Sequence, residues 1–284
     1  MSDKMRNLIT RALSGVVLFI VVLAAAYGGK YSYGVLLAAI LLVGMMEFYR
    51  IAKAGGCTPQ LVAGLVAGSV LFICGFTYFV GYENTLATDW ALIFACLLYL
   101  VLLIPAIFII ELFKMSERPL RNIAATLMGI WYVAFPITLM LFIPLMLGGG
   151  TWRAEAFLFY LFIVWANDVF AYLVGVSMGK HRMCERISPK KSWEGFFGGV
   201  IGALGMGALG ASVVGGSMAM WLGLAAIVAI TGVLGDLVES MFKREAGIKD
   251  SGNILPGHGG MLDRFDAVLI SSPFAFVYLI IYLM

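Results

Sequence analysis

The chain has 284 residues, of which 62% are apolar and only 12% are charged, and its formal net charge is +3. An average soluble chain carries about 25% charged residues, so a water-soluble globule of this composition could not cover its apolar side chains. The composition also excludes a disordered chain, and a small net charge without a basic domain argues against nucleic-acid binding. A mean hydropathy of +0.99 instead indicates an integral membrane protein with several transmembrane segments.

A transmembrane helix requires about 20 mostly apolar residues. Nine apolar runs follow one another along the chain: 8–27, 33–52, 61–81, 90–113, 122–147, 155–178, 194–215, 217–241 and 267–284. The fifth run contains Pro136 and Pro144, and we interpret it as one kinked helix because membrane helices tolerate proline. The first run follows a basic segment but has no small-residue cleavage site, so we interpret it as a transmembrane helix. We predict an all-α polytopic integral membrane protein with about nine transmembrane helices.

The distribution of basic residues tests this topology. With a cytoplasmic N-terminus, the cytoplasmic segments hold every lysine and arginine except Lys30 and Arg153. Splitting the fifth run into two spans would move the basic clusters near 180–191 and 243–264 to the other side. We therefore predict a cytoplasmic N-terminus and an outside C-terminus. Short loops without a targeting segment favour a multi-pass protein of a bacterial cell (inner) membrane.

The polar residues suggest two regions. We interpret residues 1–150 as five lipid-facing scaffold spans. Residues 151–284 supply four further spans and form the catalytic region. It contains two cytoplasmic loops, 179–193 and 242–266, which hold both histidines of the chain.

The second loop and its flanks combine three kinds of polar group. Carboxylates supply the hard oxygen ligands that Mg²⁺ prefers, and lysines and arginines suit phosphate. The glycine-rich run 256–260 supplies backbone N–H groups that can wrap a phosphate. The carboxylates are Asp236, Asp250, Asp263 and Asp266, and the cations are Lys243, Arg244, Lys249 and Arg264. Together they predict a metal–nucleotide site.

The first loop and the span before it add further candidates. Asn167 and Asp168 lie inside an otherwise apolar run, and an intramembrane carboxylate is a functional hypothesis by default. The alternative is a polar residue that packs helices together. Ser188, Lys190 and Lys191 can bind a phosphate or a lipid headgroup. For the two lysines, a positive-inside loop that attracts anionic lipid remains an equal alternative.

Two acidic residues near the ends of apolar runs receive a simpler interpretation. Glu47 lies three residues before Arg50, and Glu111 lies three residues before Lys114. This spacing places each pair on one helix face, so we predict ion pairs at the membrane interface.

Residues 240–266 also resemble a known signature. The pattern consists of Ser240, an apolar residue and Lys243-Arg244, then Lys249-Asp250, then His258-Gly-Gly, and finally Asp263-Arg264, an apolar residue and Asp266. It resembles the signature of phosphatidate cytidylyltransferases, or CDP-diacylglycerol synthases. Asn167-Asp168 with Tyr172 and Gly175, and the Ser188–Gly195 stretch, are also similar to that family. The resemblance covers roughly residues 160–284 and does not extend in detail to the first 150.

The resemblance implies a polytopic nucleotidyltransferase, usually a homodimer. Such an enzyme converts CTP and phosphatidate to CDP-diacylglycerol and pyrophosphate with Mg²⁺, either as two metal ions or as Mg²⁺ with a monovalent cation such as K⁺. The metal ligands it implies are first Asp236 and Asp263, and then Asp168 and Asp266.

The other roles follow from charge and hydrogen-bonding capacity. For the reaction that the resemblance implies, we expect four cations to stabilise the triphosphate and the leaving pyrophosphate: Lys243, Arg244, Lys249 and Arg264. Lys190 and Lys191 hold the phosphatidate headgroup or the nucleotide, and His258 positions phosphate. Three residues are candidates for contacting the cytosine base: Asn167, Asn253 and Ser188.

Three other functions are alternatives. Another CTP-dependent enzyme that activates an ether-lipid or prenyl-type phosphate would show much the same loop chemistry. A CDP-alcohol phosphotransferase would carry an Asp-Gly-x-x-Ala-Arg motif, which the chain lacks. A secondary transporter would show matched inverted halves, which the sequence does not.

Overall fold

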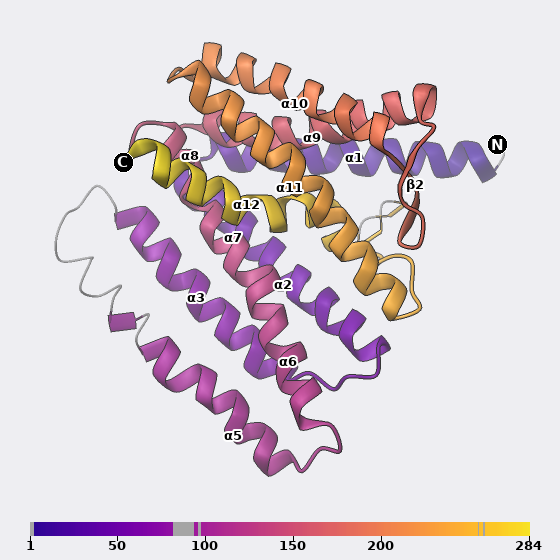
Figure 1. The fold of residues 1–284 in the computed structure, drawn as a ribbon. Coiled ribbons are helices and arrows are strands. Elements are labelled where there is room, and N and C mark those ends of the chain that lie inside the picture. Colours follow the sequence, from indigo (N-terminus) through magenta and orange to yellow (C-terminus); the bar gives the residue numbers. More distant parts are fainter. Residues whose placement is uncertain (1–2, 82–93, 96–97, 255, 258) are drawn as a thin grey trace. The chain divides into compact units, whose positions relative to one another are not determined.

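The structure is a computed structural model that describes residues 3–81, 94–95, 98–254, 256–257 and 259–284 (Figure 1). It divides into two compact units. Unit 1 comprises the residues up to Leu141 together with Phe242–Arg264, and unit 2 comprises Phe142–Met241 together with Phe265–Met284. Two helices, α11 (Met218–Glu245) and α12 (Leu262–Leu283), contribute residues to both units.

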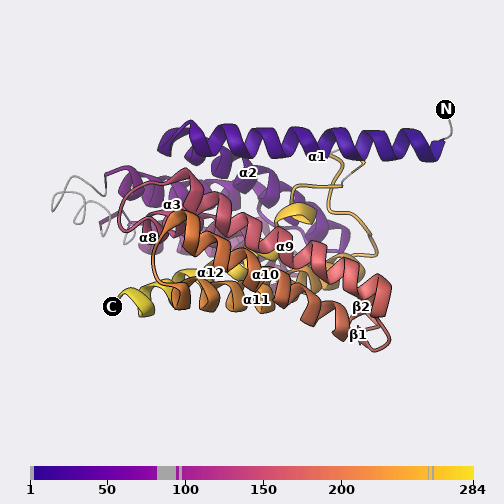
Figure 2. The same ribbon diagram turned by 90° about the horizontal axis from the view of Figure 1, so that it is seen from above.

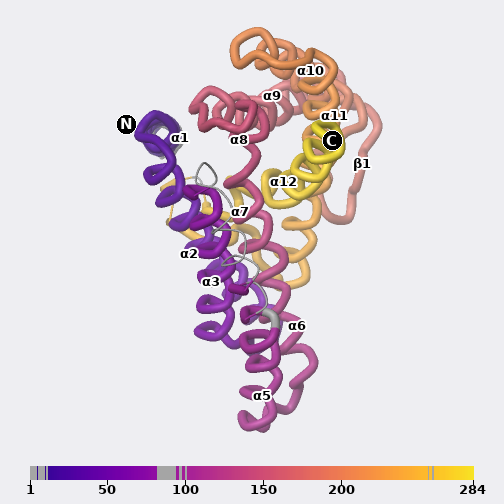
Figure 3. The backbone as a smooth tube through the Cα atoms, turned by 90° about the vertical axis from the view of Figure 1, so that its left-hand side faces the viewer, coloured from indigo at the N-terminus to yellow at the C-terminus, as the bar shows by residue number. Residues whose placement is uncertain are grey.

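Unit 1 is helical, and α2 contacts most of its other elements. Its elements are α1 (Asp3–Tyr27), α2 (Lys30–Ala54), α3 (Leu61–Gly81), the π turn η1 (Tyr99–Leu103), α5 (Ile104–Lys114), α6 (Pro119–Gly129), the π turn η2 (Ile130–Ala134) and α7 (Phe135–Met140). α2, α3 and α6 run side by side (Figure 3). Tyr49 fixes their spacing, because its hydroxyl donates to the Thr126 carbonyl at 2.9 Å. Its ring fills space that a Cβ at Gly64 or Gly129 would occupy.

Prolines account for the two π turns. Pro105 lies at the start of α5 and Pro136 at the start of α7, each directly after a π turn. A proline cannot donate a backbone hydrogen bond, and its ring clashes with the carbonyl four residues earlier. A wider turn relieves that clash without ending the helix.

Unit 2 contains a helical hairpin closed by two short strands. Its elements are α8 (Ile143–Leu147), α9 (Ala154–Met178), β1 (Arg182–Cys184), β2 (Ser188–Ser192), α10 (Trp193–Val214) and the parts of α11 and α12 assigned above. β1 and β2 pair antiparallel, with Arg182 opposite Ser192 and Cys184 opposite Ser188. The strands are a local addition to a fold that is otherwise helical.

Glycines bring α9 and α10 into close contact (Figure 2). A Cβ at Gly195 would lie 2.7 Å from the Ala171 carbonyl oxygen, and one at Gly199 would lie 2.5 Å from Asn167 Oδ1. Small residues at such a spacing let helix backbones approach closely in membranes. The two glycines therefore set the distance between these helices.

Seven stretches of the described residues are long and apolar enough to cross a membrane: Lys30–Ala54, Leu61–Gly81, Pro119–Leu147, Ala154–Met178, Trp193–Val214, Met218–Glu245 and Leu262–Leu283. They match seven of the nine predicted runs and confirm an all-α polytopic membrane protein. The predicted fifth run is a single stretch here. The first run corresponds to a shorter apolar helix, Ala12–Tyr27, and the fourth lies partly outside the described residues. The count of nine, the orientation and the division at residue 150 stay predictions.

Candidate active site

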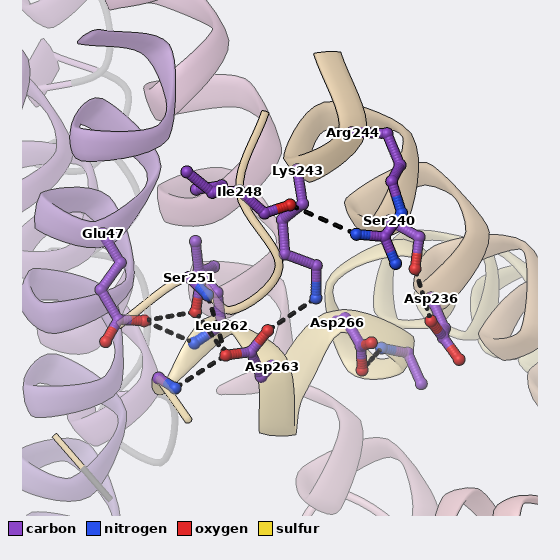
Figure 4. A network of polar contacts seen from close by, with 12 residues as sticks. Glu47, Asp236, Ser240, Lys243, Arg244, Ile248, Ser251, Leu262, Asp263 and Asp266 are labelled. Carbon is purple, nitrogen blue, oxygen red and sulfur yellow. Dashed lines mark hydrogen bonds and ion pairs between the residues drawn. The ribbon is translucent and has the colours of Figure 1, made fainter. Parts of the chain in front are cut away.

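Asp263, one of the predicted site residues, accepts hydrogen bonds from four donor groups. It lies in the first turn of α12, within unit 1. Its Oδ1 accepts from Lys243 Nζ at 2.6 Å, and both side chains are largely buried. Its Oδ2 accepts from the backbone N–H groups of Gly260 at 2.7 Å and Ser251 at 3.0 Å, and from Ser251 Oγ at 2.9 Å (Figure 4). These contacts fix the orientation of the carboxylate and leave Oδ1 with a single donor among the described residues.

A second carboxylate supports this loop from α2. Glu47 is only 3% exposed, and its Oε2 accepts from the backbone N–H of Leu262 at 2.8 Å and from Ser251 Oγ at 3.1 Å. Arg50, its predicted ion-pair partner, is exposed. The two hydrogen-bond partners of Glu47 thus lie more than 200 positions away from it in the sequence. By contrast, Glu111 does lie 4.0 Å from Lys114, as predicted.

An ion pair also anchors Asp236, one of the three predicted carboxylates of unit 2. Asp236 Oδ2 lies 2.7 Å from Lys191 Nζ. Asp236 Oδ1 accepts from Ser240 Oγ at 3.2 Å, a contact that Figure 4 shows. Lys191 also donates to the Val233 carbonyl at 3.3 Å. The pair joins the end of β2 to α11. The structure thus brings together two residues that the sequence suggested separately.

Three acidic side chains act electrostatically on Asp266 within unit 2: Asp236, Glu239 and Asp168. A Cβ at Gly235 would lie only 2.5 Å from the Asp266 carbonyl oxygen, so glycine permits the close approach of α11 to α12 at this point. Acidic groups that act on one another electrostatically disfavour each other's charged forms, and a bound cation would relieve this repulsion. Three of the four predicted metal ligands are therefore neighbours in one unit.

The donor set fits Mg²⁺ by its chemistry, because the candidate ligands are all carboxylates. Across the residues that the structure describes, no three His, Cys, Asp or Glu side chains converge into a ready metal cage. Lysine ammonium groups contact Asp236 and Asp263. These are the positions where a positive charge is already favoured.

The polar pair of α9 splits by burial. Asn167 is 1% exposed, and its Nδ2 lies 3.5 Å from the Ala229 carbonyl, whereas Asp168 is exposed. Asn167 Oδ1 accepts no hydrogen bond from a described residue. Of the two asparagines predicted to contact the cytosine base, Asn167 has its side-chain amide buried among helices, whereas Asn253 is exposed in a loop.

The remaining predicted residues line the loops. Ser188 begins β2 and is half-buried. Five are exposed: Lys190, Arg244, Lys249, Asn253 and Arg264. Arg244 Nη1 donates to the Ile248 carbonyl at 3.3 Å, which holds it along the end of α11. His258 lies outside the described residues, so its role stays a prediction.

The sequence does not single out Glu47 or Ser251 as candidate site residues. Glu47 had a basic neighbour one turn away, which offered a sufficient local partner. Ser251 is a single hydroxyl beside the more conspicuous Asp250. The available signal for Glu47 was a carboxylate within an apolar run, the same signal that singled out Asp168.

A family of known proteins and several of its individual relatives match this chain. The sequence profile of the cytidylyltransferase family matches residues 9–282. Phosphatidate cytidylyltransferase of Staphylococcus aureus (strain COL) is 48% identical over 125 residues, which are 43% of this chain and 48% of the relative. The protein of the same name from Staphylococcus epidermidis (strain ATCC 12228) is 46% identical over 133 residues, 45% of this chain and 51% of the relative. The chain thus spans about half the length of the curated relatives it matches. Because the family profile extends over nearly its whole length, the chain belongs to the cytidylyltransferase family.

Proposed function

We propose that this chain transfers the cytidylyl group of CTP to phosphatidate, giving CDP-diacylglycerol and pyrophosphate for phospholipid biosynthesis. The observation that carries this proposal is the family match over residues 9–282, joined to relatives named phosphatidate cytidylyltransferase. The seven apolar stretches support it, because they suit a protein whose substrate lies in a bilayer.

The reaction is a displacement at phosphorus. A phosphate oxygen of phosphatidate bonds to the α-phosphorus of CTP, and the bond from that phosphorus to the bridging oxygen of the β-phosphate breaks. Pyrophosphate leaves with the electron pair of that bond. Phosphatidate is already ionised near neutral pH, so no residue must remove a proton from it. The chief demand is to neutralise the charge of two anions that approach each other.

Cationic side chains meet part of this demand. We assign Lys243, Arg244, Lys249 and Arg264 to the triphosphate and the leaving pyrophosphate. Lys190 and Lys191 bind the phosphatidate headgroup or the nucleotide, and His258 positions phosphate. Asn167, Asn253 and Ser188 are the candidates for the cytosine base.

Carboxylates hold the cations. Asp236 and Asp263 are the first choice as ligands, and Asp168 and Asp266 are the second. Mg²⁺, when bound there alone or with K⁺, would neutralise phosphate charge and support departure of the pyrophosphate. The lysines that contact Asp236 and Asp263 mark where a bound cation would compete for the carboxylate oxygens.

The membrane arrangement follows from the basic residues. We propose nine transmembrane helices, a cytoplasmic N-terminus, an outside C-terminus and a site on the cytoplasmic face of the cell (inner) membrane. That face offers CTP from water and phosphatidate from the bilayer. We further propose a homodimer, on the resemblance alone.

A labelling experiment tests the proposal. Purified protein in detergent is mixed with phosphatidate, Mg²⁺ and CTP labelled at the α-phosphate, and label is counted in the lipid phase. We expect label in lipid, and we expect its loss on chelation and in Asp263→Asn. If Asp263→Asn still labels lipid, the proposed activity stands but the assignment of Asp263 as a metal ligand is wrong. If label is transferred only to ether-lipid or prenyl-type phosphates, one of these lipids is the substrate in place of phosphatidate. No transfer to any lipid phosphate by folded protein would refute the proposal.

A further inference from the structure

We propose that Glu47, on α2 in the N-terminal part of the chain, is a positioning residue for Asp263. The inference rests on the proposed function in one respect, namely that Asp263 binds a cation during the reaction. It concerns how unit 1 holds that carboxylate. Every residue in the argument belongs to unit 1.

Glu47 holds both ends of the chain segment that leads directly into Asp263. One end is Ser251, whose hydroxyl lies 3.1 Å from Glu47 Oε2. The other is Leu262, the first residue of α12, whose backbone N–H donates to the same oxygen at 2.8 Å. Leu262 precedes Asp263 directly. A shift at the Leu262 amide therefore moves the Cα of Asp263.

The Ser251 hydroxyl is shared between two carboxylates. Ser251 Oγ lies 2.9 Å from Asp263 Oδ2 as well as 3.1 Å from Glu47 Oε2, and Ser251 is 1% exposed. A hydroxyl has a single proton, so it donates to one of the two oxygens at a time. Glu47 therefore limits how strongly Ser251 binds Asp263, and it sets the hydrogen bonding of the carboxylate that would hold the cation.

The local sequence leaves room for this contact. A Cβ at Gly252 would lie 2.2 Å from Glu47 Oε1, and a Cβ at Gly260 would lie 2.5 Å from Glu47 Oε2 and 2.2 Å from Ser251 Oγ. A side chain at either position would displace the Glu47 carboxylate. Two glycines of the loop thus have a role in admitting a carboxylate from α2, besides any contact with phosphate.

An ordinary structural role would look different. Glu111 is the matched case, because it is a carboxylate of the same unit, 1% exposed, that accepts from Gln60, Ser116 and Asn122. None of its three donors is a candidate site residue. Loss of Glu111 should therefore weaken the fold and leave Asp263 as it is.

The test compares Glu47→Ala and Glu47→Gln with Glu111→Ala in the full-length protein. We measure kcat, KM for CTP and the Mg²⁺ concentration for half-maximal transfer, each per folded protein. Glu47→Ala should raise the Mg²⁺ midpoint about tenfold or more, the usual effect of losing a group that orients a metal ligand. Glu47→Gln keeps an oxygen acceptor and should recover most of that loss. Glu111→Ala should lower thermal stability with an unchanged Mg²⁺ midpoint.

A second readout does not depend on activity. Hydrogen exchange without metal or nucleotide should show faster exchange of the backbone amides of Ser251, Gly260 and Leu262 in Glu47→Ala than in the wild type or Glu111→Ala. If Glu47→Ala does not fold, Ser251→Ala carries the test, because it removes the shared hydroxyl and should also shift the Mg²⁺ midpoint.

Two results would overturn the inference. One is an Mg²⁺ midpoint in Glu47→Ala within about twofold of the Glu111→Ala value, which is the scatter expected of unrelated sites. The other is unchanged exchange of the three amides. Absence of transfer in the wild type would instead refute the proposed function, while the exchange experiment would still decide whether Glu47 holds the loop.

Discussion

The ion pair between Lys243 and Asp263 gives a quantitative test of unit 1. We consider the variants Lys243→Met and Asp263→Asn and the double variant. Methionine keeps the length of the lysine stem, and asparagine keeps the shape of the aspartate. The three proteins therefore change charge with little change of volume.

The structure sets the expected size of the effect. Lys243 Nζ lies 2.6 Å from Asp263 Oδ1, and the side chains are 11% and 8% exposed. The Coulomb attraction at this distance is about 6 kcal/mol at an effective dielectric constant near 20. Desolvation offsets much of it, and removing one partner of a buried pair usually costs about 3–5 kcal/mol. Asp263 keeps its Ser251 and Gly260 donors, so we expect the lower end for Lys243→Met, about 3 kcal/mol.

Equilibrium unfolding in mixed detergent micelles measures these free energies. The double variant should be less destabilised than the sum of the single variants by about 2 kcal/mol, because it leaves no uncompensated charge. Additivity within about 0.5 kcal/mol would mean that the two groups do not interact. The contact between Lys243 Nζ and Asp263 Oδ1 would then not stabilise the folded protein, and treating the two residues as a buried ion pair would be wrong.

Three further predictions concern other parts of the chain. Gly199→Ala should destabilise the protein by about 2 kcal/mol, because a Cβ there meets the α9 backbone, whereas Gly205→Ala, which meets nothing within 4 Å, should be neutral or stabilising. Thermal unfolding of the pair measures the difference, and equal stability would contradict the close packing of α9 and α10. Tyr49→Phe should cost about 1 kcal/mol through loss of a buried hydrogen bond, measured by the same unfolding assay. Lys191→Met should lower lipid labelling from CTP about 100-fold, because the headgroup or nucleotide loses a cationic contact and Asp236 loses the residue that orients it, and near-normal labelling would exclude Lys191 from the site.

The membrane helices could be predicted because hydrocarbon imposes a length on each apolar run. The seven described spans therefore coincide with seven predicted runs. The hairpin of β1 and β2 could not be predicted this way. Its strands are short, and β2 contains Pro189 and two lysines. The side chains of β2 therefore show no alternation of apolar and polar residues and no apolar run. The predicted sites of phosphate binding at Ser188–Lys191 nevertheless lie on that hairpin.

The site residues show a similar contrast between local and distant contacts. Asp236 and Lys243 are seven residues apart on α11, and both are candidates from the sequence alone because they lie next to and within one polar loop. The contact of Ser251 with Glu47 joins residues 204 positions apart, and nothing in either local sequence records it. The nearby Arg50 even offered a satisfactory explanation for Glu47. Long-range pairing of this kind requires the fold.

The loop that carries the signature packs with the N-terminal helices rather than standing alone. Phe242, at the end of α11, lies with its ring 5.9 Å from Phe48 and 5.3 Å from Tyr132, and Glu47 is the residue before Phe48. One turn of α2 thus places an aromatic ring against the start of the loop and a carboxylate against its end. Removing α2 would expose both contacts and leave residues 242–264 without their buried partners. Helix α2 therefore helps to position Asp263. Variants of α2 should alter cytidylyl transfer even though the signature itself lies entirely in residues 240–266.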